Sequence, residues 1–171
     1  MSRAFIALGS NVGDRAAHVT AAVTALADLG SLTGFSPVFE TAPMGPSLYP
    51  FLNAVARLET NTAPELLLEQ LLAIEVARGR VRSSKWGPRE LDLDLLTYDA
   101  RELHGTRLQL PHPQLARRDF VLGPFVCLEP ELRIGAKTVL ELWRAILHPQ
   151  LAPYARDDVP TPFGCAFGFP P

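Results

Sequence analysis

The segment LDLDLLTY, residues 91–98, alternates leucine with aspartate before it ends in LLTY. Successive side chains of a β-strand point to opposite faces of a sheet, so this pattern predicts a strand whose leucines face a core. Asp92 and Asp94 then share the other face. With a rise of about 3.3 Å per residue, their Cα atoms lie roughly 6–7 Å apart. The chain must therefore fold into a sheet that tolerates two like charges as neighbours.

Two neighbouring carboxylates repel each other, and a divalent cation between them removes that repulsion. Magnesium suits such a pair because it takes hard oxygen ligands and completes its shell with waters and substrate phosphates. The alternative is the solvated polar face of an amphipathic strand, since alternation alone is common in half-buried sheets. The residues that precede the strand favour the cation site.

Residues 78–89, RGRVRSSKWGPR, contain no acid but five cations, which are Arg78, Arg80, Arg82, Lys85 and Arg89. Because the formal net charge of the chain is -2, this cluster indicates a local anion receptor. Guanidinium groups bind phosphate oxygens through paired hydrogen bonds. A solvated basic loop is the alternative. Cations followed directly by metal-binding acids are what phosphoryl transfer requires, so the two segments together predict that chemistry.

The stretch GSNVGD, residues 9–14, places glycines between a predicted strand and a predicted helix. It lacks the lysine and hydroxyl residue of a phosphate-binding P-loop, so we do not predict a phosphate cradle there. Gly9 instead allows another group to approach the backbone closely.

Composition restricts the class of protein. The chain has 171 residues, 47% of them hydrophobic, which is typical of one globular domain. Its slightly negative charge offers no general attraction to nucleic acid or to an anionic membrane. Cys127 and Cys165 lack metal-ligand spacing and are expected to be packing thiols. The apolar stretch at residues 4–8 is too short for a signal or membrane segment, so we expect a cytoplasmic protein.

The predicted elements follow the order β-α-β-β-α-β, which is typical of an α+β ferredoxin-like sandwich with helices on one face of a mainly antiparallel sheet. The first helix begins after the cap Asp14, and the second has Thr62 as its cap and Pro64 in its first turn. The expected strands cover residues 3–9, 33–40, 51–60 and 91–98, and the expected helices cover residues 15–29 and 63–78.

C-terminal additions follow this core. VLELWRAIL, residues 139–147, predicts a last helix. We expect residues 1–148 to form a single catalytic domain. Residues 149–171 are rich in proline and predict an extended tail that packs on the domain or is partly ordered.

Four segments resemble, in order, the signatures of the 6-hydroxymethyl-7,8-dihydropterin pyrophosphokinase family of folate biosynthesis. The likeness extends from about residue 4 to residue 130. The segments are ALGSNVGDR, ETAPMG with YPFLNAV, AIEVARGRVR with KWGPRELDLDLLTYD, and LPHPQLARRDFVLGPF.

The resemblance implies transfer of the β,γ-pyrophosphoryl group of ATP to the hydroxymethyl oxygen of a reduced pterin, with release of AMP. It implies that Asp92 and Asp94 hold two magnesium ions on the triphosphate and that Arg80 and Arg89 act with them in catalysis. The implied nucleotide-binding residues are Glu75, Arg82, Lys85, Arg89, Arg107, His112 and Arg118. Lys85 stands where the family often has arginine, and a lysine loses the planar two-point grip on phosphate.

The resemblance also implies a pterin site between the rings of Phe51 and Phe120, with Asn53 hydrogen-bonded to the pterin edge. An amide suits that edge because it donates and accepts at once, and flat rings suit stacking. Without the resemblance, ordinary core packing would be the more common role of both phenylalanines. The remaining implied pterin-binding residues are Thr41, Ala42, Pro43, Met44 and Trp86.

These parts predict catalysis by placement and charge neutralisation. No dedicated base is obvious, and Asp94 or a water on the metal is the expected acceptor of the alcohol proton. We expect the loop at residues 41–50 and the loop around Trp86 to close over the substrates. The expected partners are ATP and the reduced hydroxymethyl pterin, with neither nucleic acid nor membrane, and the expected state is a monomer.

Two other classes share such a fold. An RNA-recognition module needs aromatic and basic side chains on its central strands, but the strand at residues 91–98 carries acids. A regulatory domain that senses a small molecule has no need of paired metal-binding acids beside arginines.

Overall fold

The computed structural model describes residues 1–42, 49–79 and 89–166 of the chain. Its principal elements are β1 (Ser2–Ser10), α1 (Arg15–Ala27), β2 (Ser31–Phe35), β3 (Phe39–Thr41), β4 (Phe51–Thr60), α2 (Pro64–Ala77), β5 (Asp92–Tyr98), α3 (Asp119–Leu128) and α4 (Val139–Arg144). The shorter elements are β6 (Leu103–His104), β7 (Gln109–Leu110), the 3-10 turn η1 (Leu115–Arg117), β8 (Arg133–Ile134), β9 (Lys137–Thr138) and β10 (Leu151–Pro153).

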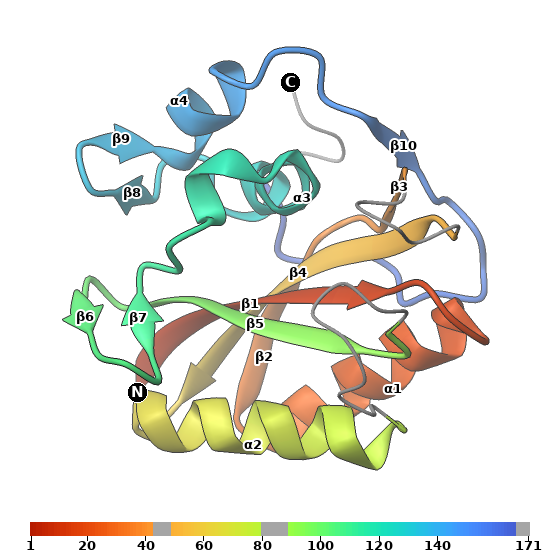
Figure 1. Cartoon of the computed structure of the whole chain (residues 1–171), viewed down its shortest axis with the longest axis horizontal. Coiled ribbons are helices and arrows are strands. Elements are labelled where there is room, and N and C mark those ends of the chain that lie inside the picture. The colour runs from red at the N-terminus through yellow and green to blue at the C-terminus, as the bar shows by residue number, and fades with distance from the viewer. Residues whose placement is uncertain (43–48, 80–88, 167–171) are drawn as a thin grey trace.

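The central sheet has the strand order β10-β3-β4-β1-β5, with β2 also paired to β4, and its neighbouring strands are antiparallel. β1 is therefore an interior strand, flanked by β4 on one side and β5 on the other (Figure 1). The α+β class and the mainly antiparallel sheet predicted from the sequence are confirmed.

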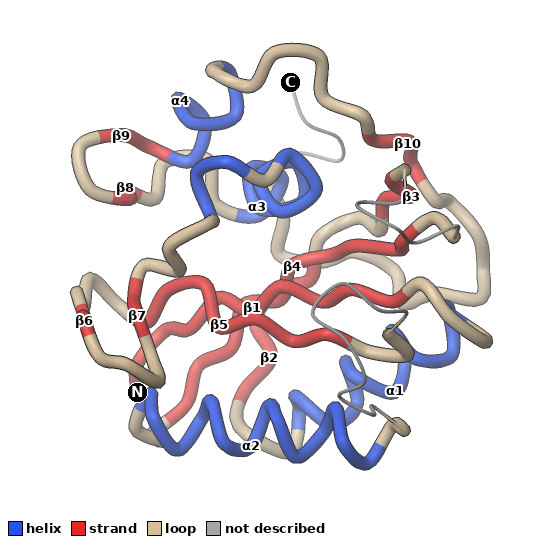
Figure 2. Tube along the Cα trace, viewed as in Figure 1, coloured by secondary structure: helices blue, strands red, loops and turns tan. Residues whose placement is uncertain are grey.

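Helices cover both faces of the sheet, as Figure 2 shows. α1 and α2 lie on one face, over the core that contains Leu8, Leu67 and Leu93. α3 and α4 lie on the other, where Phe125 packs against Phe5 with ring centroids 4.8 Å apart. The prediction of helices on one face was incomplete, because the C-terminal additions supply a second helical layer.

The sequence predicted one continuous strand over residues 33–40. That prediction was wrong, because β2 and β3 are separate strands. Pro37 has no N–H to donate. At the break, the hydroxyl of Ser36 accepts a hydrogen bond from Val55 N (2.9 Å). The two short strands then pair with different halves of β4.

Helix starts were predicted with mixed success. Asp14 caps α1 as expected, because its carboxylate accepts a hydrogen bond from Ala17 N (3.0 Å). Thr62 was the wrong cap for α2: the helix begins after Ala63, which supplies no side-chain hydrogen bond. Pro64 occupies the first turn, where its missing N–H costs nothing and its fixed φ suits a helix. The last helix ends at Arg144 rather than at residue 147.

The C-terminal segment returns to the sheet. β10 pairs with β3, and Tyr154 N donates to Val38 O (2.9 Å). Further along, Phe163 forms a bridge with Phe35 of β2. Within the part of the chain that the structure describes, no helix is long and apolar enough to cross a membrane.

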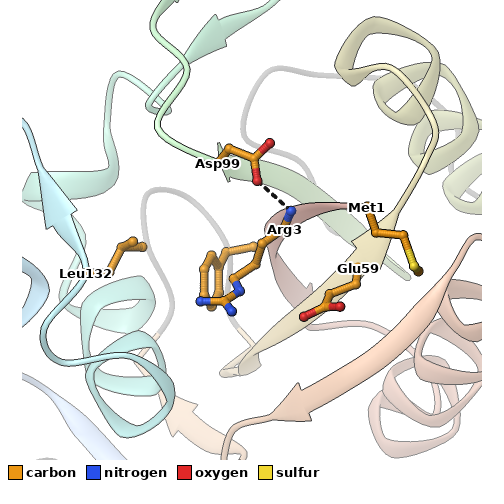
Figure 3. Close-up of a pocket in the computed structure, with 6 residues that line it drawn as sticks. Met1, Arg3, Glu59, Asp99 and Leu132 are labelled. Carbon is orange, nitrogen blue, oxygen red and sulfur yellow. Dashed lines mark hydrogen bonds between the residues drawn. The ribbon is translucent and has the colours of Figure 1, made fainter.

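Asp99 directly follows β5 in a left-handed conformation (φ 48°), and its carboxylate accepts a hydrogen bond from Arg3 N (2.7 Å; Figure 3). Burial acts to raise the pKa of Asp99, but the hydrogen bonds from Arg3 and Ser2 and the positive charge of Arg101 and the N-terminus lower it below its ordinary value. A carboxylate with a depressed folded-state pKa stabilises the fold above its unfolded pKa of about 3.9, and that contribution is lost as the pH falls further.

We predict that Asp99→Asn, which tolerates the left-handed backbone, lowers the free energy of unfolding by less than about 1 kcal/mol at pH 7, because the site is exposed. The difference from wild type should shrink toward pH 3. Urea unfolding of wild type and Asp99→Asn at pH 7 and at about pH 3 measures this difference in the free energy of unfolding. An equal difference at both pH values would contradict an ionic contribution from Asp99.

Candidate active site

The alternation predicted for β5 is confirmed. Leu93 and Leu95 are buried on the α1–α2 side of the sheet, while the side chains of Asp92 and Asp94 are 23% and 30% exposed. In the register with β1, Asp92 lies opposite Gly9 and Asp94 opposite Ala7. Both neighbours on β1 are small, so the two carboxylates stand over a part of the sheet that has little side-chain cover.

Two arginines compensate the carboxylates. Arg89 Nη1 lies 2.8 Å from Asp92 Oδ1, and Arg118 Nη1 lies 3.0 Å from Asp94 Oδ2. These charge-assisted hydrogen bonds join Asp92 to Arg89, which precedes β5, and Asp94 to Arg118, the N-cap residue of α3. The predicted gathering of acids and guanidinium groups is therefore present for these four residues.

The backbone of Arg89 is fixed by Asn11, a residue that sequence reasoning did not single out. Arg89 N donates to Asn11 Oδ1 (2.8 Å), and Asn11 N donates to Arg89 O (3.1 Å). The loop after β1 thus positions the entry to β5. The signal for this role was the GSN motif itself, because a buried asparagine after a strand needs partners for its amide.

His112 approaches the same carboxylate, with its Nε2 4.0 Å from Asp94 Oδ2. Burial is the main cause that lowers the pKa of His112, and Arg118 adds to it while Asp94 and Asp92 oppose it. The lowered pKa favours the neutral imidazole. Gln114 N donates to Nδ1 (3.2 Å), which leaves the proton on Nε2, toward Asp94.

Three side chains converge over Gly9. A Cβ atom at this position would lie 3.3 Å from Asn53 Oδ1 and 3.9 Å from both Asp92 Cβ and a ring carbon of Phe51. The prediction that Gly9 allows a close approach is confirmed. This glycine brings two predicted pterin-binding residues on β4 next to one predicted metal ligand on β5.

Two more predicted pterin-binding residues, Thr41 and Phe120, have contacts on the same side of the sheet. Asn53 Nδ2 donates to Thr41 Oγ1 (2.8 Å), so the amide is held by β3. Phe120 begins α3, and the guanidinium of Arg118 lies 5.7 Å from its ring centroid. Arg118 therefore contacts both the Asp94 carboxylate and a predicted stacking ring.

Two predicted nucleotide-binding residues have other contacts. Glu75 is buried in α2 and accepts a hydrogen bond from Leu93 N (2.7 Å), which ties α2 to β5. Arg107, whose side chain is 77% exposed, lies between β6 and β7 and pairs with Glu69 (3.4 Å). Their roles with nucleotide stay predictions. Pro43, Met44, Arg80, Arg82, Lys85 and Trp86 lie outside the described residues.

Two cavities border the sheet. One of about 400 Å³ is lined by Thr41 and Ala42 together with Glu40, Pro50 and residues 149–152. The other, of about 260 Å³, is drawn in Figure 3. Its lining residues are Met1, Arg3, Phe5, Glu59, Asp99 and Leu132, none of which is a predicted site residue.

The donor set suits magnesium. Asp92 and Asp94 offer hard oxygens on one face of β5, and both are partly open to solvent. Within the described ranges, no group of three or more histidine, cysteine or acidic side chains gathers as a metal site. A pair of carboxylates fits a cation that usually binds one or two protein carboxylates and takes the rest of its shell from water and phosphate.

Comparison with known proteins agrees with this arrangement. The family model of 7,8-dihydro-6-hydroxymethylpterin-pyrophosphokinase (HPPK) matches residues 5–130. The 2-amino-4-hydroxy-6-hydroxymethyldihydropteridine pyrophosphokinase of Methylorubrum extorquens is 42% identical over 144 residues, which cover 82% of this chain and 91% of that protein. The protein of the same name from Pseudomonas aeruginosa is 43% identical over 137 residues, or 78% and 85% of the two chains.

Solved structures show the same fold. An HPPK-DHPS chain of Plasmodium falciparum superposes with a TM-score of 0.65 at 14% identity, covering 84% of this chain and 45% of that longer chain. The match to the family model includes most of β1 and all of β4, β5 and α3, the elements that carry the carboxylates and the residues around Gly9. The chain belongs to the 7,8-dihydro-6-hydroxymethylpterin-pyrophosphokinase family.

Proposed function

We propose that this protein transfers the β,γ-pyrophosphoryl group of ATP to the hydroxymethyl oxygen of 6-hydroxymethyl-7,8-dihydropterin, giving the pterin diphosphate and AMP in folate biosynthesis. The observation that carries the proposal is the convergence over Gly9, where Asp92 of β5 meets Phe51 and Asn53 of β4. A phosphate-binding and a pterin-binding half then share one face of the sheet. Membership of the family supports the same reaction.

Asp92 and Asp94 are the residues that would hold two magnesium ions with the triphosphate. Bound there, magnesium supplies charge neutralisation to the phosphate oxygens. The chain contributes a site whose two acids point the same way from one rigid strand, which keeps their spacing constant.

Arg89 and Arg118 are placed to exchange partners. In the structure each guanidinium contacts a carboxylate, and each has further N–H groups beyond the one that makes this contact. When cations and a triphosphate occupy the site, the same guanidinium groups lie next to the phosphate oxygens and stabilise the charge that develops on them. His112 lies beside them, with Nε2 4.0 Å from Asp94 Oδ2, and its imidazole would offer a hydrogen bond to a phosphate oxygen.

The pterin lies between the rings of Phe51 and Phe120, with Asn53 at its edge. Thr41 takes one N–H of the Asn53 amide and so orients the rest of it. A pterin held there would have its hydroxymethyl group close to the triphosphate that Asp92 and Asp94 hold through magnesium. The nucleotide roles of Glu75, Arg82, Lys85 and Arg107, the catalytic role of Arg80, and loop closure by residues 41–50 and Trp86 belong to the same proposal.

Asp94 is the residue of the chain best placed to accept the proton of the alcohol, since its carboxylate lies on the reacting face. Its Oδ2 accepts a hydrogen bond from Arg118 in the structure, so this contact must loosen before Oδ2 can accept the alcohol proton. We further propose that the protein acts as a cytoplasmic monomer on small molecules and binds neither nucleic acid nor membrane.

Incubation with ATP, magnesium and the reduced hydroxymethyl pterin is predicted to give AMP and the pterin diphosphate in equal amounts, because the β- and γ-phosphates leave together. Separation of the adenine nucleotides by ion-exchange chromatography identifies the product. Formation of ADP would instead mean transfer of a single phosphoryl group and would refute the proposal.

Asp94→Asn is predicted to lower kcat by at least about a hundredfold, because it removes one anionic metal ligand at the reacting centre. The matched control is Asp28→Asn, which neutralises an exposed aspartate at the end of α1 and should leave the rate unchanged. Circular dichroism shows whether both variants are folded. A folded Asp94→Asn protein with a rate close to wild type would remove Asp94 from the mechanism.

A further inference from the structure

Gly13, Asp14 and Arg15 end the segment ALGSNVGDR. They have no role in the chemistry described so far, but each has a distinct structural role. Gly13 turns the chain with φ 66°, and Asp14 caps α1. Arg15 is consequently the first residue of that helix, and its backbone N–H donates to Gly13 O (3.1 Å). The turn and the cap thus fix the position from which the Arg15 side chain extends.

The Arg15 guanidinium joins two segments that are far apart in the sequence. Its Nη1 donates to Pro50 O (2.8 Å), and its Nη2 lies 2.8 Å from Glu40 Oε2. Glu40 directly precedes Thr41 in β3, and Pro50 directly precedes Phe51 in β4. Thr41 and Phe51 are register partners in that strand pair. One side chain therefore ties together the residues that flank two predicted pterin contacts.

Arg15 holds this strand pair from the side opposite the proposed pterin. Thr41 contacts Asn53 on the reacting face, and the side chain of Glu40, its neighbour in the strand, points to the other face. α1 also lies on that other face, over the core of Leu8 and Leu93. Any effect of Arg15 on the pterin is thus transmitted through the backbone of β3 and β4.

The contacts of Arg15 lie next to the cavity of about 400 Å³. Both partners of Arg15, Glu40 and Pro50, line it together with Thr41 and Ala42. The side chains of Arg15 and Glu40 are 24% and 38% exposed, so water partly screens the ion pair, and the hydrogen bond to Pro50 O adds to it. The guanidinium therefore bonds two of the residues that line this cavity.

We propose that Arg15 is a positioning residue for the pterin: it holds the ends of β3 and β4 so that Thr41, Asn53 and Phe51 keep the spacing that a bicyclic ring needs. The inference rests on the proposed function, because it assigns the pterin to this part of the sheet. We expect nucleotide binding to be unaffected, since β5, which carries the carboxylates, lies on the other side of β1 from β3.

The planar fork of arginine is required for this contact. It presents N–H groups in fixed directions, so one side chain reaches a carboxylate and a carbonyl at the same time. A lysine in its place carries the charge but lacks the two-point geometry. Arg15→Lys therefore separates the loss of positioning from the loss of a positive charge.

Steady-state kinetics of Arg15→Ala and Arg15→Lys test the proposal. For Arg15→Ala we expect the KM for the pterin to rise about tenfold, while kcat and the KM for ATP stay within about twofold of wild type. For Arg15→Lys we expect a pterin KM between that of wild type and that of Arg15→Ala. A rise in KM at constant kcat is the mark of lost substrate binding, and a purely structural role would not select one substrate.

Arg57→Ala is the matched control. Arg57 also holds a carboxylate and a carbonyl, those of Glu129 and Thr33, but it does so elsewhere along β4. Its removal should lower the melting temperature and leave both KM values unchanged. If it raises the pterin KM as much as Arg15→Ala does, general loss of stability explains the effect and the proposal is wrong.

The two proposals fail in different ways. If wild-type protein forms no AMP from ATP and the pterin, the proposed function fails. If the wild type forms AMP but the pterin KM of Arg15→Lys and of Arg15→Ala equals that of wild type, only the positioning role is overturned. Should Arg15→Ala not fold, Arg15→Lys decides alone, and an unchanged pterin KM in that variant refutes the proposal.

Discussion

The structure depends on the compensation of two like charges on one short strand. Asp92 and Asp94 point the same way from β5, and Arg89 and Arg118 each contribute a hydrogen bond to one of them. Without cations such a pair would destabilise the sheet, because neighbouring carboxylates at reduced solvent exposure repel. The arginines stabilise the two carboxylates in the structure, and in the proposed mechanism they also contact the triphosphate. The electrostatic requirement of the fold and that of the reaction are met by the same residues.

β1 connects the two halves of the site because it lies between β4 and β5. At Gly9 the absence of a side chain lets Asn53 and Asp92, on opposite flanking strands, approach each other. Just beyond, Asn11 holds the entry to β5, and Arg15 holds the ends of β3 and β4. Asn11 in the loop after β1 and Arg15 at the start of α1 thus fix both halves through polar contacts.

Much of the site could be predicted, and the failures have physical causes. The alternation of β5 and the cap Asp14 follow from local geometry, and both predictions were correct. Thr62 was wrong as a cap because Pro64 starts α2 one residue later. The contacts of Asn11 and Arg15 were missed because they join residues 78 and 35 positions apart. No periodicity within one segment indicates partners at such separations.

By itself, the sequence determined which side chains share a face and where most elements begin, because strand and helix periods depend only on backbone geometry. It also identified the acids, the cations and the family. The tertiary structure alone decided that α3 covers the second face, that Arg118 reaches Asp94, and that Arg15 joins β3 to β4. These contacts depend on strand order and register, which are set by packing between distant segments and not by any local pattern.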